Sequence, residues 1–223
     1  MRAAKLIEEF RDGSRLSNEE IHSEEFRLSS DELSYAEEEA IEAYTGEQYS
    51  SMNGILRNYK KWKSEMSSYL EDEAVGDYEL EDDYEIKEFV RTQLSTLTAE
   101  AEEYTRFLRN ALGKAKTKKN MITYRGLSPN YMNEIKDNLK VGGVIVDAGF
   151  ISTSTDKNVA RNFASDNGYV MEVLIPVGSH ATSVNHLSSN SGEDEVLIKN
   201  NSTFEICEVN HEEKKLVVYL RKD

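Results

Sequence analysis

Three short segments carry side chains that could act together on one small molecule. They are 124–126 (Tyr-Arg-Gly), 150–154 (Phe-Ile-Ser-Thr-Ser) and 193–195 (Glu-Asp-Glu), and each lies at the start or end of a β-like run. An arginine can hold a phosphate through two parallel hydrogen bonds, and a carboxylate can stabilise positive charge as it develops. With small hydroxyls beside them, such groups can bind a dinucleotide and break its glycosidic bond.

Arg125 and the hydroxyls each have an ordinary structural alternative. Arg125 ends an apolar run just before Gly126, which would let a ligand approach the backbone closely. A surface ion pair is the alternative role for this arginine. Ser152 and Ser154 are two residues apart on an extended segment, so their side chains share one face. They could hold a carboxylate or a ligand amide, but a strand rich in Ser and Thr also has good β propensity without any ligand.

Glu193 and Glu195 also stand two residues apart, directly before the apolar run 196–198. Extended backbone is expected to place both carboxylates on one side, close enough to influence each other's ionisation. A solvent-exposed acidic strand end would have the same sequence. The preceding segment 188–192 (Ser-Ser-Asn-Ser-Gly) is a polar loop that could place Glu193 against a second substrate.

In this chain order, the arginine, the Ser-Thr-Ser segment and the Glu-x-Glu segment resemble the arginine–serine–glutamate class of mono-ADP-ribosyltransferases. The first half of the chain adds a second match. Residues 44–53, followed by a Leu-Arg pair, resemble the helix that contacts the nicotinamide dinucleotide in the bacterial toxin branch of the class. Tyr49 and Asn53 are one helical turn apart and share a face, whereas Tyr44 ends the previous helix. A tyrosine-rich core stripe is the alternative.

The resemblance implies a substrate and a role for each group. Arg125 would anchor a phosphate of NAD, Ser152 would hold Glu195, and Glu195 would bind the ribose and stabilise an oxocarbenium-like transition state. Glu193 would steer the arginine of a target protein and help to remove its proton. NAD is then a substrate, and no metal is implied. The implied NAD contacts are Tyr44, Tyr49, Asn53, Arg125, Gly126, Ser152, Thr153 and Phe163, the last of which could also be a core residue.

Two positions depart from the class. Gly149 stands where toxin relatives often carry an asparagine, and the loop before Glu193 has His186 but no Phe, Tyr or Trp. The expected activity is transfer of ADP-ribose from NAD to protein arginine, because a glutamate at the position of Glu193 accompanies arginine acceptors in the class. An NAD glycohydrolase, which transfers ADP-ribose only to water, shares every motif. A non-catalytic acidic protein that binds a basic surface is the other alternative.

The elements that must position these residues begin with a helical front in residues 1–118. Apolar side chains recur there every three or four positions, first over 33–44 and most clearly over 86–108. Ser30, followed by two acidic residues, is the expected N-cap of the first of these helices. A further helix is expected to begin near Glu47.

After residue 118 the pattern changes to short runs of β-forming residues separated by glycine and asparagine. A short helix is expected near 158–164. Helices followed by such runs predict one α+β domain over residues 1–223, in which the helices pack on a two-sheet β-sandwich. The resemblance implies that this is the ADP-ribosyltransferase fold. The expected strands are 121–124, 144–146, 150–153, 169–175, 196–198, 203–209 and 215–220.

Charge is distributed unevenly along the chain. Residues 1–105 hold 28 acidic and 11 basic residues, a net charge of −17, whereas residues 106–223 hold 14 acidic and 16 basic residues, a net charge of +2. A strongly acidic half argues against direct binding of nucleic acid or of an anionic membrane. The acidic segment 71–85 is expected to be a solvated loop, and a docking surface for a basic partner is its alternative.

Cysteine and histidine usage predicts neither disulfide nor metal chemistry. Cys207 is the only cysteine, and the four histidines show no ligand spacing. No apolar run is long enough to span a membrane. Acidic residues interrupt the first ten positions, where a signal peptide needs an apolar stretch. Action in the cytoplasm of the producing or the target cell is therefore expected, with secretion or injection left open. Enzymes of the class occur as secreted toxins, injected effectors and phage proteins.

Overall fold

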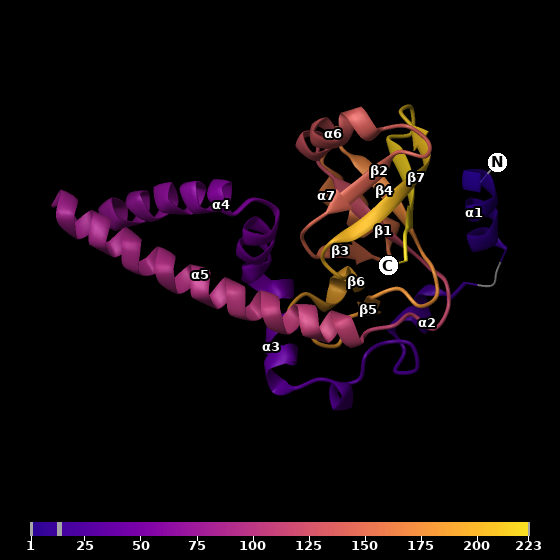
Figure 1. Ribbon diagram of the computed structural model, residues 1–223, viewed down its shortest axis with the longest axis horizontal. Coiled ribbons are helices and arrows are strands. Elements are labelled where there is room, and N and C mark those ends of the chain that lie inside the picture. Colours follow the sequence, from indigo (N-terminus) through magenta and orange to yellow (C-terminus); the bar gives the residue numbers. More distant parts are fainter. Residues whose placement is uncertain (1, 13–14, 223) are drawn as a thin grey trace.

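The computed structural model describes residues 2–12 and 15–222 (Figure 1). Helices occupy the first half and strands dominate the second, which confirms the predicted α+β class. The division lies between the end of α5 and the start of β1, close to residue 118. The helices and helical turns are α1 (Arg2–Arg11), α2 (Asn18–His22), η1 (Ser30–Glu32), α3 (Tyr35–Ala43), η2 (Tyr44–Gln48), α4 (Tyr49–Gly76), α5 (Asp83–Lys114), α6 (Pro129–Ile135), η3 (Lys136–Asn138), α7 (Lys157–Ala164) and η4 (Ser191–Glu193).

Within the described residues, the strands form one mixed sheet in the order β2-β7-β8-β4-β1-β3-β6-β5. β8 runs parallel to β4, whereas the other neighbours are antiparallel. The strands are β1 (Met121–Leu127), β2 (Val144–Asp147), β3 (Ile151–Ser154), β4 (Tyr169–Ile175), β5 (Ala181–Ser183), β6 (Glu195–Ile198), β7 (Ser202–Asn210) and β8 (Lys215–Leu220). The predicted strands are confirmed within a few residues at their ends, and β5 is an addition.

The sheet nearly divides in its middle. β1 and β3 share a single residue pair, Tyr124 with Ser154, whereas β1 and β4 pair along seven residues. Five strands therefore lie on one side of this junction and three on the other. The predicted sandwich of two separate sheets was wrong in this respect, because that one pair keeps all the strands in one hydrogen-bonded sheet.

Two long helices, α4 and α5, pack against each other and project from the sheet as a hairpin (Figure 1). α5 covers the strongest apolar stripe of the sequence, as predicted. α4 continues to Gly76 and α5 begins at Asp83, so both ends of segment 71–85 are helical, and only residues 77–82 connect the two helices. The loop prediction was wrong there because Leu70 and Ala74 are buried in the hairpin and extend the apolar face of α4.

The start of α3 differs from the prediction. Ser34 is its N-cap and forms a capping box with Glu37, whereas Ser30 lies inside the short turn η1. Ser29 forms a similar capping box with Glu32. Serine followed three residues later by glutamate thus recurs in this stretch, and the sequence alone does not rank these competing helix starts.

Two breaks isolate the short helical stretch 49–57 from the helices around it. Before it, the π-helical turn η2 contains Gly46, whose φ of −95° and ψ of −124° are not helical. After it, Asn58 has a φ of −160° and a ψ of 83° inside α4. The helix expected near Glu47 therefore begins at Tyr49. Its first two turns, before the break at Asn58, face the sheet.

The helical front and the sheet share a buried core. Phe150 and Leu197 of the sheet half pack with residues of α3 and α5, including Ile41 and Leu108. A second core covers the sheet itself and includes Ile21 of α2. The prediction that residues 1–223 make up a single domain stays a prediction. No helix in the described part of the chain is both long and apolar enough to cross a membrane.

Candidate active site

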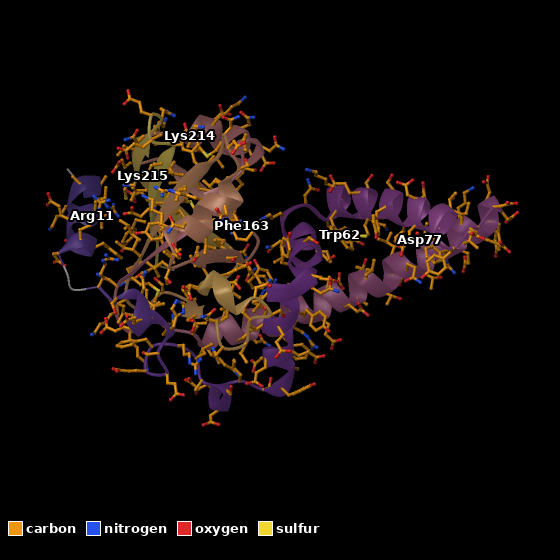
Figure 2. All side chains as sticks on the ribbon, turned by 180° about the vertical axis from the view of Figure 1, so that it is seen from behind. Arg11, Trp62, Asp77, Phe163, Lys214 and Lys215 are labelled. Carbon is orange, nitrogen blue, oxygen red and sulfur yellow. The ribbon has the colours of Figure 1, made fainter. Side chains whose placement is uncertain are left out.

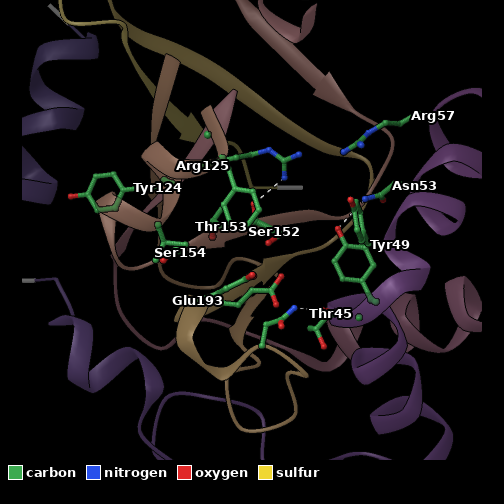
Figure 3. Close-up of a pocket in the computed structure, with 18 residues that line it drawn as sticks. Thr45, Tyr49, Asn53, Arg57, Tyr124, Arg125, Ser152, Thr153, Ser154 and Glu193 are labelled. Carbon is green, nitrogen blue, oxygen red and sulfur yellow. Dashed lines mark hydrogen bonds between the residues drawn. The ribbon is translucent and has the colours of Figure 1, made fainter. Parts of the chain in front are cut away.

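A cavity of about 370 Å³ opens where the sheet nearly divides (Figure 3). One wall consists of β1 and β3, and the opposite wall consists of η2 and the first turns of α4. α7 and the loop before β6 complete it. Figure 3 shows Arg125 and Ser152 on the sheet side, facing Tyr49 and Asn53. Every residue proposed from the sequence lines this space: Tyr44, Tyr49, Asn53, Arg125, Gly126, Ser152, Thr153, Phe163, Glu193 and Glu195.

Arg125 lies at the point where β1 and β3 separate. Their pairing consists of Tyr124 and Ser154, and the next residue of β1 is the arginine. Its Nη1 atom donates a hydrogen bond of 2.9 Å to the carbonyl oxygen of Ser152. The guanidinium therefore bridges the gap between the two strands. Its remaining N–H groups can serve an anionic ligand, because a guanidinium carries five donors in one plane.

Glu195 is the more deeply buried of the two cavity carboxylates, with 4% of its surface exposed. It begins β6 and pairs with Ser154. Burial raises the pKa of this carboxyl to about 7, and Glu193 adds to the shift, whereas a hydrogen bond from Ser152 and the charge of Arg125 oppose it. A positively charged ligand group beside Glu195 would favour its ionised form. The site thus suits a reaction in which positive charge develops.

Glu193 reaches the cavity by a different route from the one predicted. It ends the helical turn η4, and Asp194 has the left-handed backbone conformation, with a φ of 48° and a ψ of 51°. The expectation that extended backbone carries both carboxylates was therefore wrong. Both carboxylates still line one cavity. The tight turn at Asp194 brings them together, and the alternation of side chains along a strand does not. Burial raises the pKa of Glu193 as well.

The three hydroxyls of the Ser-Thr-Ser segment have separate tasks. Ser152 contributes a hydrogen bond to Glu195. Thr153 donates through Oγ1 to the carbonyl oxygen of Val196 at 2.8 Å, which fastens β3 to β6. The Oγ atom of Ser154 accepts from the backbone N–H of Asp156 at 2.9 Å and so supports the turn after β3. Ser152 is therefore the hydroxyl that is placed to act on the carboxylate.

Tyr44 and Asn53 form a buried hydrogen-bond network with the backbone of Phe150. The Tyr44 hydroxyl donates to the Phe150 carbonyl oxygen at 3.1 Å and accepts from Nδ2 of Asn53 at 2.9 Å. The backbone N–H of Phe150 donates to Oδ1 of Asn53 at 2.8 Å. Burial raises the pKa of Tyr44 to about 12. These two side chains thus hold the helical wall against the start of β3, whereas Tyr49 is 56% exposed and free to meet a ligand.

Phe163 is an exposed aromatic ring at the cavity edge. It lies on α7, on the side of the sheet that faces the helical hairpin (Figure 2), and 62% of its surface is exposed. The alternative of a core residue is therefore wrong. α7 approaches β1 closely at Gly126, where an added Cβ atom would lie 2.3 Å from the carbonyl oxygen of Ala160. This close approach brings the ring into the cavity wall.

The sequence profile of the ADP-ribosyltransferase exoenzymes matches residues 19–221. The chain belongs to this family. The NAD(+)–arginine ADP-ribosyltransferase EFV of Enterococcus faecalis is 28% identical over 172 residues, which cover 75% of this chain and 28% of EFV. The ADP-ribosyltransferase Vis of Vibrio splendidus is 30% identical over 162 residues, which cover 66% of this chain and 62% of Vis. The chain thus spans less than two thirds of the length of either relative.

Solved structures of ADP-ribosyltransferases share the fold. The C3 exoenzyme of Clostridium limosum matches with a TM-score of 0.61 and 19% identity, over 97% of this chain and 95% of the other. Vis in complex with the M6 inhibitor matches with a TM-score of 0.60 and 23% identity, over 99% and 85%. At such identities the likeness concerns the fold. It confirms the ADP-ribosyltransferase fold that the motifs implied.

The exoenzyme cavity includes one further charged residue, Arg57, to which the sequence analysis gave no role. Arg57 lines the wall and forms a bidentate ion pair with Asp147, with Nε–Oδ1 and Nη2–Oδ2 distances of 2.8 and 3.0 Å. An added Cβ atom at Gly149 would lie 2.6 Å from Oδ1 of Asn53 and 2.8 Å from Nε of Arg57. The departure from asparagine at this position is thus explained by the side chains that fill the space. Arg57 is the arginine of the Leu-Arg pair in the resemblance, and its helical spacing from Asn53 was the signal for its place in this wall.

Thr45 and Asn190 were also missed. Nδ2 of Asn190 donates to the carbonyl oxygen of Thr45 at 3.2 Å, and the backbone N–H of Ser189 donates to Oγ1 of Thr45 at 3.1 Å. These bonds attach the loop before Glu193 to the helical wall. No sequence pattern links residues so far apart. Across residues 2–12 and 15–222, no group of three or more His, Cys, Asp or Glu side chains is arranged to hold a metal ion.

Proposed function

We propose that this ADP-ribosyltransferase exoenzyme transfers ADP-ribose from NAD to an arginine side chain of a target protein and releases nicotinamide. The observation that carries the proposal is the placement of Glu193 and Glu195 with Arg125 around one cavity. EFV bears the name of an NAD(+)–arginine ADP-ribosyltransferase, and a structure of Vis was solved with agmatine, whose guanidinium group resembles that of arginine. Both relatives therefore support arginine as the acceptor.

The chemical step needs an anion beside the ribose. The bond between C1′ of the ribose and the nicotinamide nitrogen breaks, nicotinamide leaves as a neutral molecule, and C1′ becomes cationic, as in glycosidases. Glu195 hydrogen-bonds the ribose hydroxyl and stabilises that cation, while Arg125 holds a phosphate and orients the ligand. Tyr49 and Phe163 offer aromatic faces to the rings of NAD.

Glu193 acts in the second half of the reaction, the attack of the target arginine on C1′. A guanidinium nitrogen of the target attacks C1′, and the new C–N bond leaves an excess proton on that nitrogen. The raised pKa of Glu193 suits it to accept this proton, because a more basic carboxylate is a better general base. The position of Glu193 at the end of η4, nearer to the open loop than Glu195, suits contact with an incoming protein.

Replacing Glu193 by Gln tests whether this carboxylate is needed for transfer of ADP-ribose to arginine. Arginine transfer, measured with agmatine and NAD, is expected to fall by about 100-fold, the usual effect of removing a general base. NAD hydrolysis is expected to persist near the wild-type rate, since Glu195 remains. The matched control is Glu212→Gln, an exposed glutamate in the turn between β7 and β8, which should leave both rates unchanged. Unaltered transfer in Glu193→Gln would contradict the proposed role, and hydrolysis without transfer in the wild type would favour the glycohydrolase.

The pH dependence follows from the pKa of Glu195. Since the ionised form is the active one and the pKa is about 7, kcat/KM for NAD should rise by about tenfold per pH unit below this value and level off above it. The positive charge of bound NAD favours the ionised form of Glu195 and so lowers its pKa. The rise of kcat with pH should therefore occur at a lower pH than the rise of kcat/KM. Initial rates of NAD hydrolysis across this range provide the measurement. A profile that is flat or falls with rising pH would contradict the assignment.

The place of action and the partner are part of the proposal. NAD and an arginine-bearing protein are the proposed partners, and the cytoplasm of the producing or the target cell is the proposed compartment. Exoenzyme S of Pseudomonas aeruginosa, which shares the fold, was solved in complex with human 14-3-3 protein beta. Mass spectrometry of lysate proteins labelled with NAD in the presence of this enzyme would identify the modified arginines.

A further inference from the structure

His22, outside the cavity, connects two strands that flank the one carrying Glu195. It is the last residue of α2, and each ring nitrogen meets a buried hydroxyl. Nδ1 lies 2.7 Å from Oγ of Ser183, and Nε2 lies 2.9 Å from Oγ1 of Thr155. The two hydroxyl residues are 1% and 2% exposed. A neutral imidazole can satisfy both, because one nitrogen donates and the other accepts.

The two contacts of His22 lie on opposite sides of β6. In the sheet, β6 lies between β3 and β5. Ser183 belongs to β5 and pairs with Val196, while Thr155 directly follows the β3 residue that pairs with Glu195. The imidazole therefore spans β6 at its first two residues. Ile21 of the same helix is buried in the main core and so anchors α2.

Thr155 also supports the turn that separates the two carboxylates. Its backbone N–H donates to the carbonyl oxygen of Asp194 at 3.1 Å. On its other side, its carbonyl oxygen accepts from Nδ2 of Asn18 at 3.1 Å. Asp194 is the residue in the left-handed conformation. α2 thus holds, through Thr155, the backbone that directs Glu193 and Glu195 into the cavity.

We propose that His22 is a positioning residue that fixes the Glu195 carboxylate for breaking the glycosidic bond, acting through Thr155 and Ser183. This inference rests on the proposed function only in that Glu195 must act on NAD. Burial lowers the pKa of His22, although Asp194 opposes the shift, so the neutral ring that bridges two hydroxyls is favoured. Cleavage depends on sub-ångström placement of the carboxylate, whereas NAD binding depends mainly on groups that His22 does not touch.

The test compares His22→Ala with His22→Asn and His22→Gln by steady-state NAD hydrolysis and by transfer to agmatine. His22→Ala removes both links, and a displaced Glu195 should lower kcat by about 10-fold or more in both reactions. KM for NAD should stay within about twofold, since the other walls of the cavity are intact. The Asn side chain reaches about as far as Nδ1 and the Gln side chain about as far as Nε2, so each amide should restore part of kcat.

The control is His211→Ala, which removes another histidine that meets a hydroxyl, that of Tyr169, at 2.7 Å. Neither of these two residues lines the cavity. His211→Ala should leave kcat unchanged. Thermal melting shows whether each variant is folded, and if His22→Ala does not fold, the two amide variants decide. Wild-type kcat in His22→Ala, a rise in KM without a fall in kcat, or amide variants no better than Ala would each overturn the proposal. If the wild type hydrolyses NAD but does not modify agmatine, the acceptor assignment fails while the effect on hydrolysis still tests His22.

Discussion

Glu195→Gln is expected to lower kcat for arginine transfer and for NAD hydrolysis together, by about 100-fold or more. The amide preserves the size of the side chain and can still accept the hydrogen bond from Ser152. It carries no negative charge, so it cannot stabilise the cationic ribose. The measurement is release of nicotinamide with and without agmatine. Full hydrolysis in this variant would remove Glu195 from the chemistry, whatever happened to transfer.

The same substitution should stabilise the folded protein above neutral pH. The carboxyl has a pKa of about 7 when folded, compared with an ordinary value of 4.5. Between these values the folded chain keeps a proton that the unfolded chain releases, so wild-type stability falls as the pH rises through this window, by about 3 kcal/mol at most. The stability of Glu195→Gln should not fall in this way, because the amide does not ionise. The melting temperature of this variant should exceed that of the wild type at pH 8, and the difference should shrink toward pH 4.5.

Gly126→Ala is expected to disrupt the cavity without touching a charged group. The added Cβ atom would lie 2.3 Å from the carbonyl oxygen of Ala160 and 2.5 Å from the backbone nitrogen of Ala164. Both atoms belong to the backbone of α7, so the whole helix must move. We expect a loss of about 1–3 kcal/mol in the free energy of unfolding from this overpacking. We also expect kcat/KM for NAD to fall by about 100-fold, because Phe163 moves with the helix.

The matched control for this helix displacement is Gly76→Ala. Gly76 ends α4, and beyond its chain neighbours and the adjacent backbone of α4, no atom lies within 4 Å of the position that its Cβ would occupy. This variant should match the wild type in kcat/KM and should lose no stability in urea unfolding, because alanine favours a helix more than glycine does. Normal NAD kinetics in Gly126→Ala would show that α7 tolerates the methyl group and does not set the cavity wall.

Local patterns were sufficient where the elements are long or where the chemistry is local. The apolar stripe over 86–108 predicted α5, and the β-forming runs predicted most strands. When one face of an element is buried, apolar residues recur along the sequence with the period of that element. The order of Arg125, the Ser-Thr-Ser segment and the Glu-x-Glu segment resembles that of the mono-ADP-ribosyltransferases, and this resemblance implied that their side chains share one site. Spacing of this kind is visible in the chain before it folds.

Features that depend on contacts between residues far apart in the sequence could not be predicted from local patterns. β5 has three residues, too few to show alternation, and is held by its pairing with β6. The turn at Asp194 requires an unusual backbone conformation for a residue other than glycine, and Thr155 holds it from another part of the sheet. The two contacts of His22 join residues separated by 161 and 133 positions. Such interactions are decided by the assembled structure.

The position of β8 determines when the sheet beside the cavity can be completed. This strand, Lys215–Leu220, lies in the interior of the sheet, parallel to β4 and antiparallel to β7. A ribosome makes it after all its neighbours, so the sheet of a growing nascent chain has a gap beside β4, the strand that supports β1 and Arg125. The sheet that carries the Arg125 side of the cavity is therefore complete only when residue 220 has emerged and β8 has inserted between its partners.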